Sequence, residues 1–398
     1  MILPILIILI ALLAAGWVAY GTVAGLGVYP QGVQWIVWSR TLQWPLVAVA
    51  IICSIALIGL VISGKRRAWW LIGLAPVLAL FVHRFANSPM RNFAILDNPA
   101  FVGAEVAAIS DDDFVVGLVF ANTPYAYPYS ALYSNPVIIQ SDQTKRMMLI
   151  WSAFANRAVA ANIDREFRAR ELEIVSMPAN ALLLYDSRSG QFINGVTGAR
   201  ADGSKVIGFY GTLAVTKTTW KNWRALHPGS KALAVAPLPS APATPAAPIL
   251  PVYPMKPQPG GAREMRIIFI PATQPAAIAE EQIGVAPLNL TAGDVPLLLF
   301  REKESGMLRA FDRRVDKDLI PRFRLNTTRR PGLLIDADTN STWSAGGVVV
   351  DGSKEMKGRK LTAVAAEEEL FWGVMKNWYP TLQLLNPPVP ANPNRPGR

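Results

Sequence analysis

The most constraining feature of this sequence is an internal repeat in its last two thirds. Residues 182–228 contain LLLYDSRSG followed by TTWKNWRALHP, and residues 333–380 contain LLIDADTNS followed by LFWGVMKNWYP. Three pairs of residues align at an offset of about 150 positions: Asp186 with Asp336, Asp202 with Asp351, and Trp220 with Trp372. Self-similarity at a fixed period is the signature of a repeated structural unit, so the sequence predicts two copies of one domain.

The N-terminal region is apolar and nearly free of charge. Residues 1–83 contain no Asp or Glu, and apolar runs cover residues 2–20, 44–62 and 68–82. A helix needs about 20 apolar residues to cross a bilayer, so the first two runs are long enough. The third run is shorter, and it is either a third transmembrane helix or a re-entrant or interfacial helix. We expect three transmembrane helices.

The basic turn at residues 64–67, Gly-Lys-Arg-Arg, indicates the orientation of these helices. Cytoplasmic loops are enriched in Lys and Arg, so this turn is expected in the cytoplasm. The loop at residues 28–43 and everything after about residue 86 then lie outside. The first run lacks the basic start of a secretory signal and is expected to be retained. We expect a protein of the bacterial inner (cytoplasmic) membrane with periplasmic soluble domains.

Tryptophans crowd the ends of the apolar runs. These candidate partner-contact residues are Trp35, Trp38, Trp44, Trp69 and Trp70. Amphipathic aromatic rings are enriched at both membrane–water interfaces, so one interpretation is an aromatic belt. The other is a surface that packs against another membrane protein or a pigment.

Composition limits the classes of site that the chain can carry. The sequence has 39 Lys and Arg against 28 Asp and Glu, a net charge of +11 without any dense basic cluster, which argues against nucleic-acid binding. The single cysteine, Cys53, excludes a disulfide within the chain and a thiolate metal cluster. With only two histidines, a His-rich metal site is not expected either. We therefore expect no metal and no cofactor.

Beyond about residue 86, short β-prone runs bounded by Asn, Asp, Gly and Pro predict strands. Helices are expected at residues 164–172 and 365–376. The predicted fold class is α+β, with N-terminal transmembrane helices followed by two related β-rich domains in tandem. The predicted domains are a membrane domain at 1–86, a first β-rich domain at 87–235, a Pro/Ala-rich linker at 236–262, a second β-rich domain at 263–385, and an extended Pro-rich tail at 386–398.

The order of these motifs resembles the bacterial domain-of-unknown-function family numbered 3179. The residues that carry the resemblance are LLLYDSRSG, TTWKNWRALHP, YAYPYSAL at residues 125–132 and ILDNPAF at residues 95–101. The resemblance covers residues 90–235 and, mainly in its latter half, residues 265–385. In the second copy, LLIDADTNSTW fits the family's Asp-Thr-Gly-Ser-x-Trp pattern, whereas Ile193 stands at the tryptophan position of the first copy.

The resemblance implies a domain type and not a reaction, because the activity of this family is not established. It also implies one difference. Many members carry a Cys-Pro-x-Cys segment, and the matching positions here are Ser152 and Ala155. Redox exchange and soft-metal binding need thiolates, so the resemblance implies that such chemistry is absent from this chain.

The repeated residues are interpreted as structural. Asp186 and Asp336 follow apolar runs and precede turn residues, where an Asp side chain hydrogen-bonds the backbone two residues on. The segments that begin at Asp202 and Asp351 read Asp-Gly-Ser-Lys, which indicates hairpin turns. Core packing is the main interpretation of the paired tryptophans, and an aromatic ligand groove is the alternative. No catalytic motif is recognised, so we do not expect an enzyme.

Two functional hypotheses remain open. The first is a non-catalytic, membrane-anchored accessory or scaffold subunit of a larger membrane complex, photosynthetic or respiratory, whose partners are integral membrane subunits and the lipid bilayer. The second is a membrane-anchored periplasmic ligand-binding protein or enzyme, with its site between the two repeat domains, because ligand sites occur preferentially at domain interfaces.

Overall fold

The computed structural model of the chain describes residues 2–20, 32–86, 88–91, 93–234 and 265–386. N-terminal helices are followed by a β-rich region with several sheets, which is an α+β architecture. The chain divides into two compact units, Met1–Ala262 and Arg263–Arg398. The expected linker lies outside the described residues, and so does the expected tail after residue 386.

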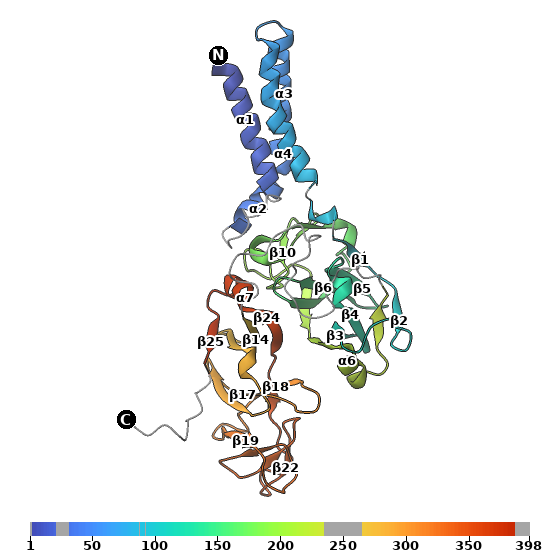
Figure 1. The fold of residues 1–398 in the computed structure, drawn as a ribbon, viewed down its shortest axis with the longest axis vertical. Helices are drawn as coiled ribbons and strands as arrows, with labels where there is room; N and C mark the ends of the chain where they lie inside the picture. Colours follow the sequence, from blue (N-terminus) through green and yellow to red (C-terminus); the bar gives the residue numbers. More distant parts are fainter. Residues whose placement is uncertain (1, 21–31, 87, 92, 235–264, 387–398) are drawn as a thin grey trace, which may run out of the picture. The chain divides into compact units, whose positions relative to one another are not determined.

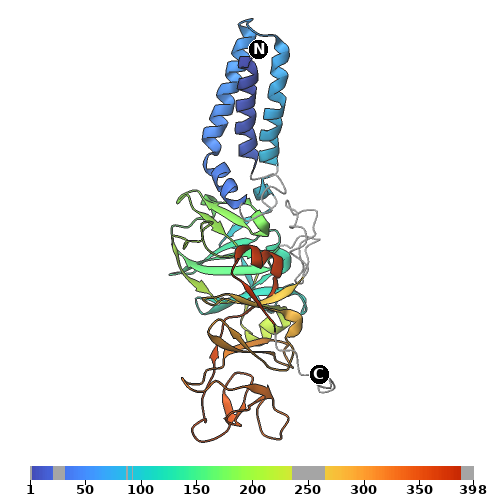
Figure 2. The ribbon, with the colours of Figure 1, turned by 90° about the vertical axis from the view of Figure 1, so that its left-hand side faces the viewer.

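Three helical elements of the first unit lie side by side (Figures 1 and 2). They are α1 (Ile2–Ala19), α3 (Gln43–Ile62), and the continuous pair η2 (Ala68–Leu74) and α4 (Ala75–Ala86). Each is long and apolar enough to cross a membrane. Their shared core consists of Ala11, Ala14, Ala15, Ala50 and Val77. Small side chains at these positions allow the helices to approach closely.

The third element is longer than its apolar run suggests. Its first seven residues form a 3₁₀ helix and its last twelve form an α-helix. At 2.0 Å per residue for the first part and 1.5 Å for the second, the element is about 32 Å long. The 20-residue α3 is about 30 Å long by the same measure. The two elements therefore match in length.

The segment expected to connect the first two transmembrane helices, residues 28–43, contains a helix in its described part, α2 (Gly32–Thr41). Its buried residues are Gly32, Val33, Ile36 and Ser39. This spacing of three to four residues places them on one face. A helix of ten residues is too short to span a bilayer.

The strands that the structure describes in the first unit form three sheets. Figure 1 labels β1 to β6 and β10 among them. The first sheet has the order β12 (Val215–Thr219), β3 (Phe114–Phe120), β4 (Thr123–Pro128), β13 (Lys231–Leu233), β2 (Phe101–Gly103). The second has the order β1 (Ile95–Asp97), β5 (Val137–Ser141), β6 (Arg146–Ser152), β7 (Arg157–Ile163), β11 (Phe209–Leu213). The third has the order β10 (Phe192–Asn194), β9 (Leu183–Asp186), β8 (Leu172–Ser176).

The second sheet is the middle layer of the first unit. The Tyr127 hydroxyl on β4 donates to Gln140 Oε1 on β5 at 2.6 Å, which joins the first and second sheets. Burial at this position raises the pKa of Tyr127 well above its ordinary value. On the other face, Leu182 N donates to Ser152 Oγ on β6 at 3.2 Å, next to the third sheet. All of β6 after its first residue is buried, as expected for a strand covered on both faces.

Helix α6 (Trp220–Leu226) packs against the first sheet through Trp220 and Trp223. Gly117 on β3 lies directly beneath this helix, because a Cβ atom there would stand 2.4 Å from Trp223 Cε3. We expect Gly117→Ala to destabilise the first unit by about 2 kcal/mol, since overpacking displaces the indole. Thermal unfolding of the detergent-solubilised chain measures the effect.

Gly229→Ala is the matched control, because nothing lies within 4 Å of its added Cβ. It should change stability by less than about 0.5 kcal/mol. Equal effects of the two substitutions would contradict the close packing of Trp223 on β3.

The described residues of the second unit, 265–386, also form three sheets. Their strand orders are β24 (Glu367–Phe371), β14 (Arg266–Ile270), β15 (Ala276–Ala279), β25 (Gln383–Leu385); then β16 (Leu288–Ala292), β17 (Val295–Arg301), β18 (Leu308–Asp312), β23 (Thr362–Ala363); and then β19 (Phe323–Leu325), β20 (Leu334–Asp336), β21 (Thr342–Trp343), β22 (Val349–Asp351). Helix α7 (Trp372–Trp378) follows β24. The remaining short helices of the chain are η3 (Pro89–Arg91), α5 (Tyr129–Leu132), η4 (Ala169–Glu171), η5 (Pro178–Asn180) and η6 (Glu280–Gln282).

Strand β17 lies at the centre of the second unit. Leu297 and Leu299 belong to a core cluster shared with β14 and β15. Leu298 and Phe300 belong to a second cluster, shared with β20 and β21. Alternate side chains of a strand point to opposite faces, so the middle sheet is covered on both sides.

The two units connect their strands in the same order. In the first unit, β3 pairs with β4 and β12, β13 runs parallel to β4, and α6 follows β12. In the second unit, β14 pairs with β15 and β24, β25 runs parallel to β15, and α7 follows β24. The antiparallel runs β5-β6-β7 and β16-β17-β18 have the same pairing, and so do β8-β9-β10 and β19-β20-β21.

The helix expected at residues 164–172 is wrong, and the one expected at residues 365–376 is right only from residue 372, where α7 begins. Residues 164–171 form turns and the single 3₁₀ turn η4, and residues 367–371 form β24. The acidic run of β24 is held extended by pairing with β14 and by ion pairs of Arg266 with Glu369 and of Arg301 with Glu368. Tertiary contacts of this kind override the helical preference of Glu.

Candidate functional site

The outer surface of the three N-terminal helices is apolar. Its exposed side chains include Leu13, Ile52, Ile55, Ile72 and Leu78, each more than 60% exposed. Soluble proteins rarely expose a contiguous apolar patch of this kind, which marks a surface for lipid or for another protein. This surface and the residues at its base form the first candidate site.

The predicted tryptophans lie at two levels along these helices. Trp44 is near the start of α3, and Trp35 and Trp38 of α2 stack edge to face with ring centroids 5.3 Å apart. Trp69 and Trp70 follow the far end of α3 and stack with centroids 4.2 Å apart. All are exposed except Trp70, which is half-buried. The length of α3, about 30 Å, separates the two levels and equals the thickness of a hydrocarbon core.

A cluster of three charged residues joins the helices to the β-strands of the first unit. Arg40 of α2 donates from Nε and Nη2 to Glu173 Oε2 of β8, at 3.0 and 2.5 Å. Arg84 of α4 lies 3.6 Å from Glu173 Oε1 and donates to Gln43 Oε1 of α3 at 3.3 Å. The Arg40 guanidinium also lies over the ring of Tyr185 on β9, 4.7 Å from its centroid. We call Arg40, Arg84 and Glu173 the junction cluster.

The junction cluster is largely shielded from water. The side chains of Arg40, Arg84 and Glu173 are 17%, 7% and 26% exposed. A charge-assisted bond in such a place has a fixed geometry and is screened little by salt. The junction cluster therefore fixes β8 of the first unit against two helices. The sequence gives no sign of this contact, because Arg40 and Glu173 lie 133 positions apart in the chain.

Asp186 and Asp336 occupy the same place in their units, at the ends of β9 and β20. Asp186 Oδ1 accepts from Arg188 N at 3.1 Å, and Oδ2 accepts from the Ser189 hydroxyl. Asp336 accepts from two backbone amides, from the Thr339 hydroxyl and from Trp343 Nε1, the last at 2.8 Å. Both carboxylates are buried and closed over by their own turns, so they have a clear structural role.

Trp220 and Trp372 also occupy matching places, as the first residues of α6 and α7. Four residues later, Arg224 lies over the Trp220 ring at 5.4 Å and Lys376 lies over the Trp372 ring at 5.8 Å. Trp220 is buried and Trp372 is half-buried. A cation over an indole face stabilises each helix start.

Asp202 and Asp351 differ in their surroundings. Asp202 Oδ1 accepts from Ser204 N and Oγ within a turn, and these hydrogen bonds lower the pKa of Asp202. Asp351 ends β22 and accepts from Arg330 Nε at 2.6 Å. The hairpin turns expected at both positions are wrong. The strand after Asp202 is β11, which pairs with β7 and not with β10, and the strand after Asp351 begins only at Thr362 and pairs with β18.

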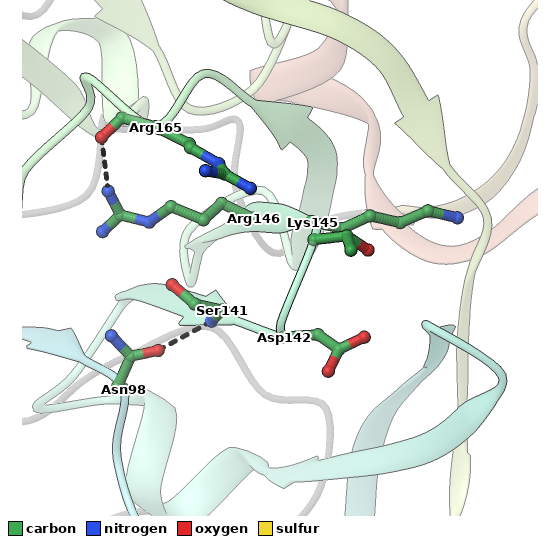
Figure 3. Close-up of a pocket in the computed structure, with 7 residues that line it drawn as sticks. Asn98, Ser141, Asp142, Lys145, Arg146 and Arg165 are labelled. Atoms are coloured by element: carbon green, nitrogen blue, oxygen red, sulfur yellow. Dashed lines mark hydrogen bonds between the residues drawn. The ribbon is translucent and has the colours of Figure 1, made fainter.

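A second candidate site is an open pocket of about 320 Å³ at one end of the middle sheet of the first unit (Figure 3). We call it the turn pocket. It is lined by Asn98, Ser141, Asp142, Thr144, Lys145, Arg146 and Arg165. These residues come from the end of β1, the β5–β6 turn and the segment after β7. The sequence alone gives little signal for it beyond the adjacent Lys145 and Arg146.

Arg146 organises one wall of the turn pocket. Its Nη1 donates to the carbonyl oxygens of Arg165 and Phe167, at 2.9 and 2.5 Å, and its Nη2 lies 3.3 Å from Asp97 Oδ1. The bond to Arg165 is drawn in Figure 3. Opposite, Asn98 Oδ1 accepts from Ser141 N at 2.7 Å. The pocket walls are therefore held by hydrogen bonds between distant segments.

The turn that carries Arg165 is held by a tyrosine. The Tyr210 hydroxyl donates to Asp164 Oδ2 at 2.6 Å; this bond lowers the pKa of Asp164 and raises that of Tyr210. A carboxyl whose folded pKa is depressed adds stability above its unfolded pKa, and that stability is lost as the pH falls through the folded pKa. We expect Tyr210→Phe to raise the pKa of Asp164 towards its ordinary value.

Carboxyl ¹³C chemical shifts, followed through an acid titration, measure this change. A pKa of Asp164 that is unaltered by Tyr210→Phe would contradict the role of the tyrosine hydroxyl. Asp202 is the internal control, because its partner Ser204 is untouched.

Two further observations bear on chemistry. Among the residues that the structure describes, no group of three or more His, Cys, Asp or Glu side chains could hold a metal ion. Ser152 and Ala155 are fully buried at the β6–β7 turn, and Cys53 is half-buried in α3.

Comparison with known proteins places the chain in a family. The model of the family described as protein of unknown function DUF3179 matches residues 93–382 in one continuous match, which runs through both units. No curated protein and no solved structure matches the chain. Since the match covers most of the sequence, the chain belongs to the DUF3179 family of proteins of unknown function.

Proposed function

We propose that this protein is a non-catalytic, membrane-anchored accessory subunit of a larger membrane protein complex. The observation that carries the proposal is the junction cluster beneath an apolar helical bundle. Glu173 of β8 is held by Arg40 and Arg84 from two different helices. A flexible linker would suffice to tether a soluble enzyme, whereas this cluster fixes the first unit to its anchor, as a brace requires.

The anchor consists of three transmembrane helices. Their outward side chains are apolar, and their lengths match a hydrocarbon core of about 30 Å. The exposed rings of Trp44 and Trp69 lie at the two levels where a membrane–water interface would be. The basic turn at residues 65–67 would lie on the cytoplasmic side and both β-rich units on the periplasmic side.

The two β-rich units are two copies of one domain. Their strands pair in the same order, and Asp186 and Asp336 close equivalent turns. Trp220 and Trp372 begin equivalent helices. One family match runs through both units, so both belong to the region that this family shares.

The partners of the anchor are other membrane-spanning subunits. Between the two tryptophan levels, α1 and α3 expose Leu13, Ile52 and Ile55 without any charge, so this surface accepts either lipid or apolar helices. Helix association in a bilayer depends on close packing, which a rigid three-helix anchor favours.

A second candidate function is ligand binding, which the turn pocket favours. Its volume of about 320 Å³ falls within the range of small-molecule sites. This pocket lies within the first unit, at the end of its middle sheet. The two functions are compatible, because the turn pocket and the junction cluster share no residue.

Single-cysteine labelling tests the proposed anchor and its orientation. Cys53 is the only cysteine, so Cys53→Ser gives a thiol-free background for Ser63→Cys in the turn after α3 or Ser110→Cys in the first β-rich unit. Both serines are exposed. A membrane-impermeant maleimide should label position 110 in intact spheroplasts. It should label position 63 only after the spheroplasts are permeabilised. Labelling of both positions in intact spheroplasts, or release of the chain by alkaline carbonate, would contradict the proposal.

A further inference from the structure

The turn pocket arises where the first unit departs from the strand plan that it shares with the second. In the first unit, the four residues 142–145 join β5 to β6. In the second unit, Gly293 and Asp294 alone join β16 to β17. The first unit also adds β1, which pairs in parallel with β5 and delivers Asn98 to the pocket. A two-residue turn is the common hairpin connection, so the longer turn is a specific addition.

The turn pocket carries more positive than negative charge. Its lining contains three cations, Lys145, Arg146 and Arg165, and one carboxylate, Asp142. Asp97 partly compensates Arg146. The side chains of Lys145 and Arg165 form no hydrogen bond or ion pair with any residue that the structure describes. Two cations are therefore available to a ligand.

The surroundings of these cations are arranged before any ligand binds. Arg146 holds the backbone of Arg165 and Phe167, and Tyr210 holds Asp164 in the same turn. On the facing side, Asp142 N donates to Lys145 O at 2.8 Å and closes the β5–β6 turn. Ordering these segments in advance lowers the entropy cost of binding.

We propose that the turn pocket binds the phosphate group of a small phosphate ester. Lys145 and Arg165 supply the opposite charge, and the exposed hydroxyls of Ser141 and Thr144 supply donors. The volume of about 320 Å³ leaves room beside a phosphate for an organic part of the ligand. Asp142 can accept a hydrogen bond from a hydroxyl of that part. A free polyol phosphate and the headgroup of a phospholipid share this chemistry.

Binding to the full chain in nanodiscs tests the proposal. Glycerol 3-phosphate is titrated against chain in phosphatidylcholine nanodiscs, and the experiment is repeated in nanodiscs with phosphatidylglycerol. The double variant Lys145→Ala/Arg165→Ala should weaken glycerol 3-phosphate binding about ten-fold, since two charge-assisted contacts are lost. The matched control is Lys231→Ala/Arg168→Ala, which removes two exposed cations outside the pocket and should change affinity less than about two-fold.

A third variant distinguishes a lost ligand contact from a misfolded chain, because it is expected to bind more tightly. Asp142→Asn removes the carboxylate of the lining and should tighten binding of inorganic phosphate about three-fold. Saturation by glycerol 3-phosphate without competition from phosphatidylglycerol supports the proposal with a soluble ligand; competition supports it with a lipid headgroup. The absence of saturable binding to the unaltered chain, or an equal loss in the control variant, would overturn the proposal.

Discussion

Replacing Asp336 by alanine is expected to cost the second unit about 4 kcal/mol, because four donors, among them the buried Trp343 Nε1, lose their acceptor at once. These donors are the amides of Asp338 and Thr339, the Thr339 hydroxyl and Trp343 Nε1. The carboxylate is fully buried, so water does not replace it without disrupting the turn. Hydrogen–deuterium exchange of β20 and β21 peptides in the detergent-solubilised chain measures the loss as a local opening free energy.

Asp186→Ala is the matched substitution in the first unit. Asp186 accepts from one amide and one hydroxyl, so the expected loss is about 2 kcal/mol. Hydrogen–deuterium exchange of β20 and β21 should be the same in Asp186→Ala as in the unaltered chain. If Asp336→Ala cost no more than Asp186→Ala, the hydrogen bonds around Asp336 would not stabilise the fold as described.

Replacing Glu173 by glutamine is expected to loosen the helices from the first unit by about 2 kcal/mol, since Arg84 then keeps a buried charge without a counterion. The expected loss of stability is smaller than for a fully buried ion pair, because the Glu173 side chain is 26% exposed. Faster hydrogen–deuterium exchange is expected in β8, in α2 and in the end of α4 that carries Arg84. A double-mutant cycle with Arg40→Gln isolates the energy of the Arg40–Glu173 contact.

Glu166→Gln is the control for the junction cluster. Glu166 pairs with Arg188 at 2.6 Å, but the two side chains are 65% and 44% exposed. Surface pairs of this kind contribute less than about 1 kcal/mol. Equal exchange in α2 for both variants would contradict a specific role of Glu173.

The long helices could be predicted from the sequence because their signal is local. Runs of about 20 apolar residues have few alternatives to a membrane helix. The ten-residue α2 escapes this rule, although its spacing of Val33, Ile36 and Ser39 is helical. The β-rich character of the rest was also predictable, since short β-prone runs separated by turn residues are a local signal as well.

The first half of the helix expected at residues 365–376 shows where local signals fail, because residues 367–371 form β24 and the helix begins only at Trp372. Three consecutive glutamates favour a helix by intrinsic preference. In the fold, Arg266 and Arg301 draw Glu369 and Glu368 into a strand beside β14. These arginines are distant in sequence, so the outcome depends on contacts that no local pattern contains.

The candidate sites could not be predicted from the sequence for the same reason. The junction cluster joins residues 133 positions apart, and the turn pocket brings Asn98 beside the β5–β6 turn through strand pairing. Asp186 and Asp336, in contrast, could be assigned to turns because an Asp side chain caps the backbone only two or three residues ahead. Asp351 could not, because its partner Arg330 lies 21 positions away in the chain.

Purification of the chain from its native membrane in a mild detergent, with quantitative mass spectrometry of the material that co-purifies, tests the proposed function most directly. The account predicts that other integral membrane proteins are recovered with the chain in a fixed ratio. It also predicts that Glu173→Gln leaves this association intact, because the anchor makes it, while altering protease access to the β-rich units. Recovery of the chain alone, as a monomer or homo-oligomer, would contradict the accessory-subunit function.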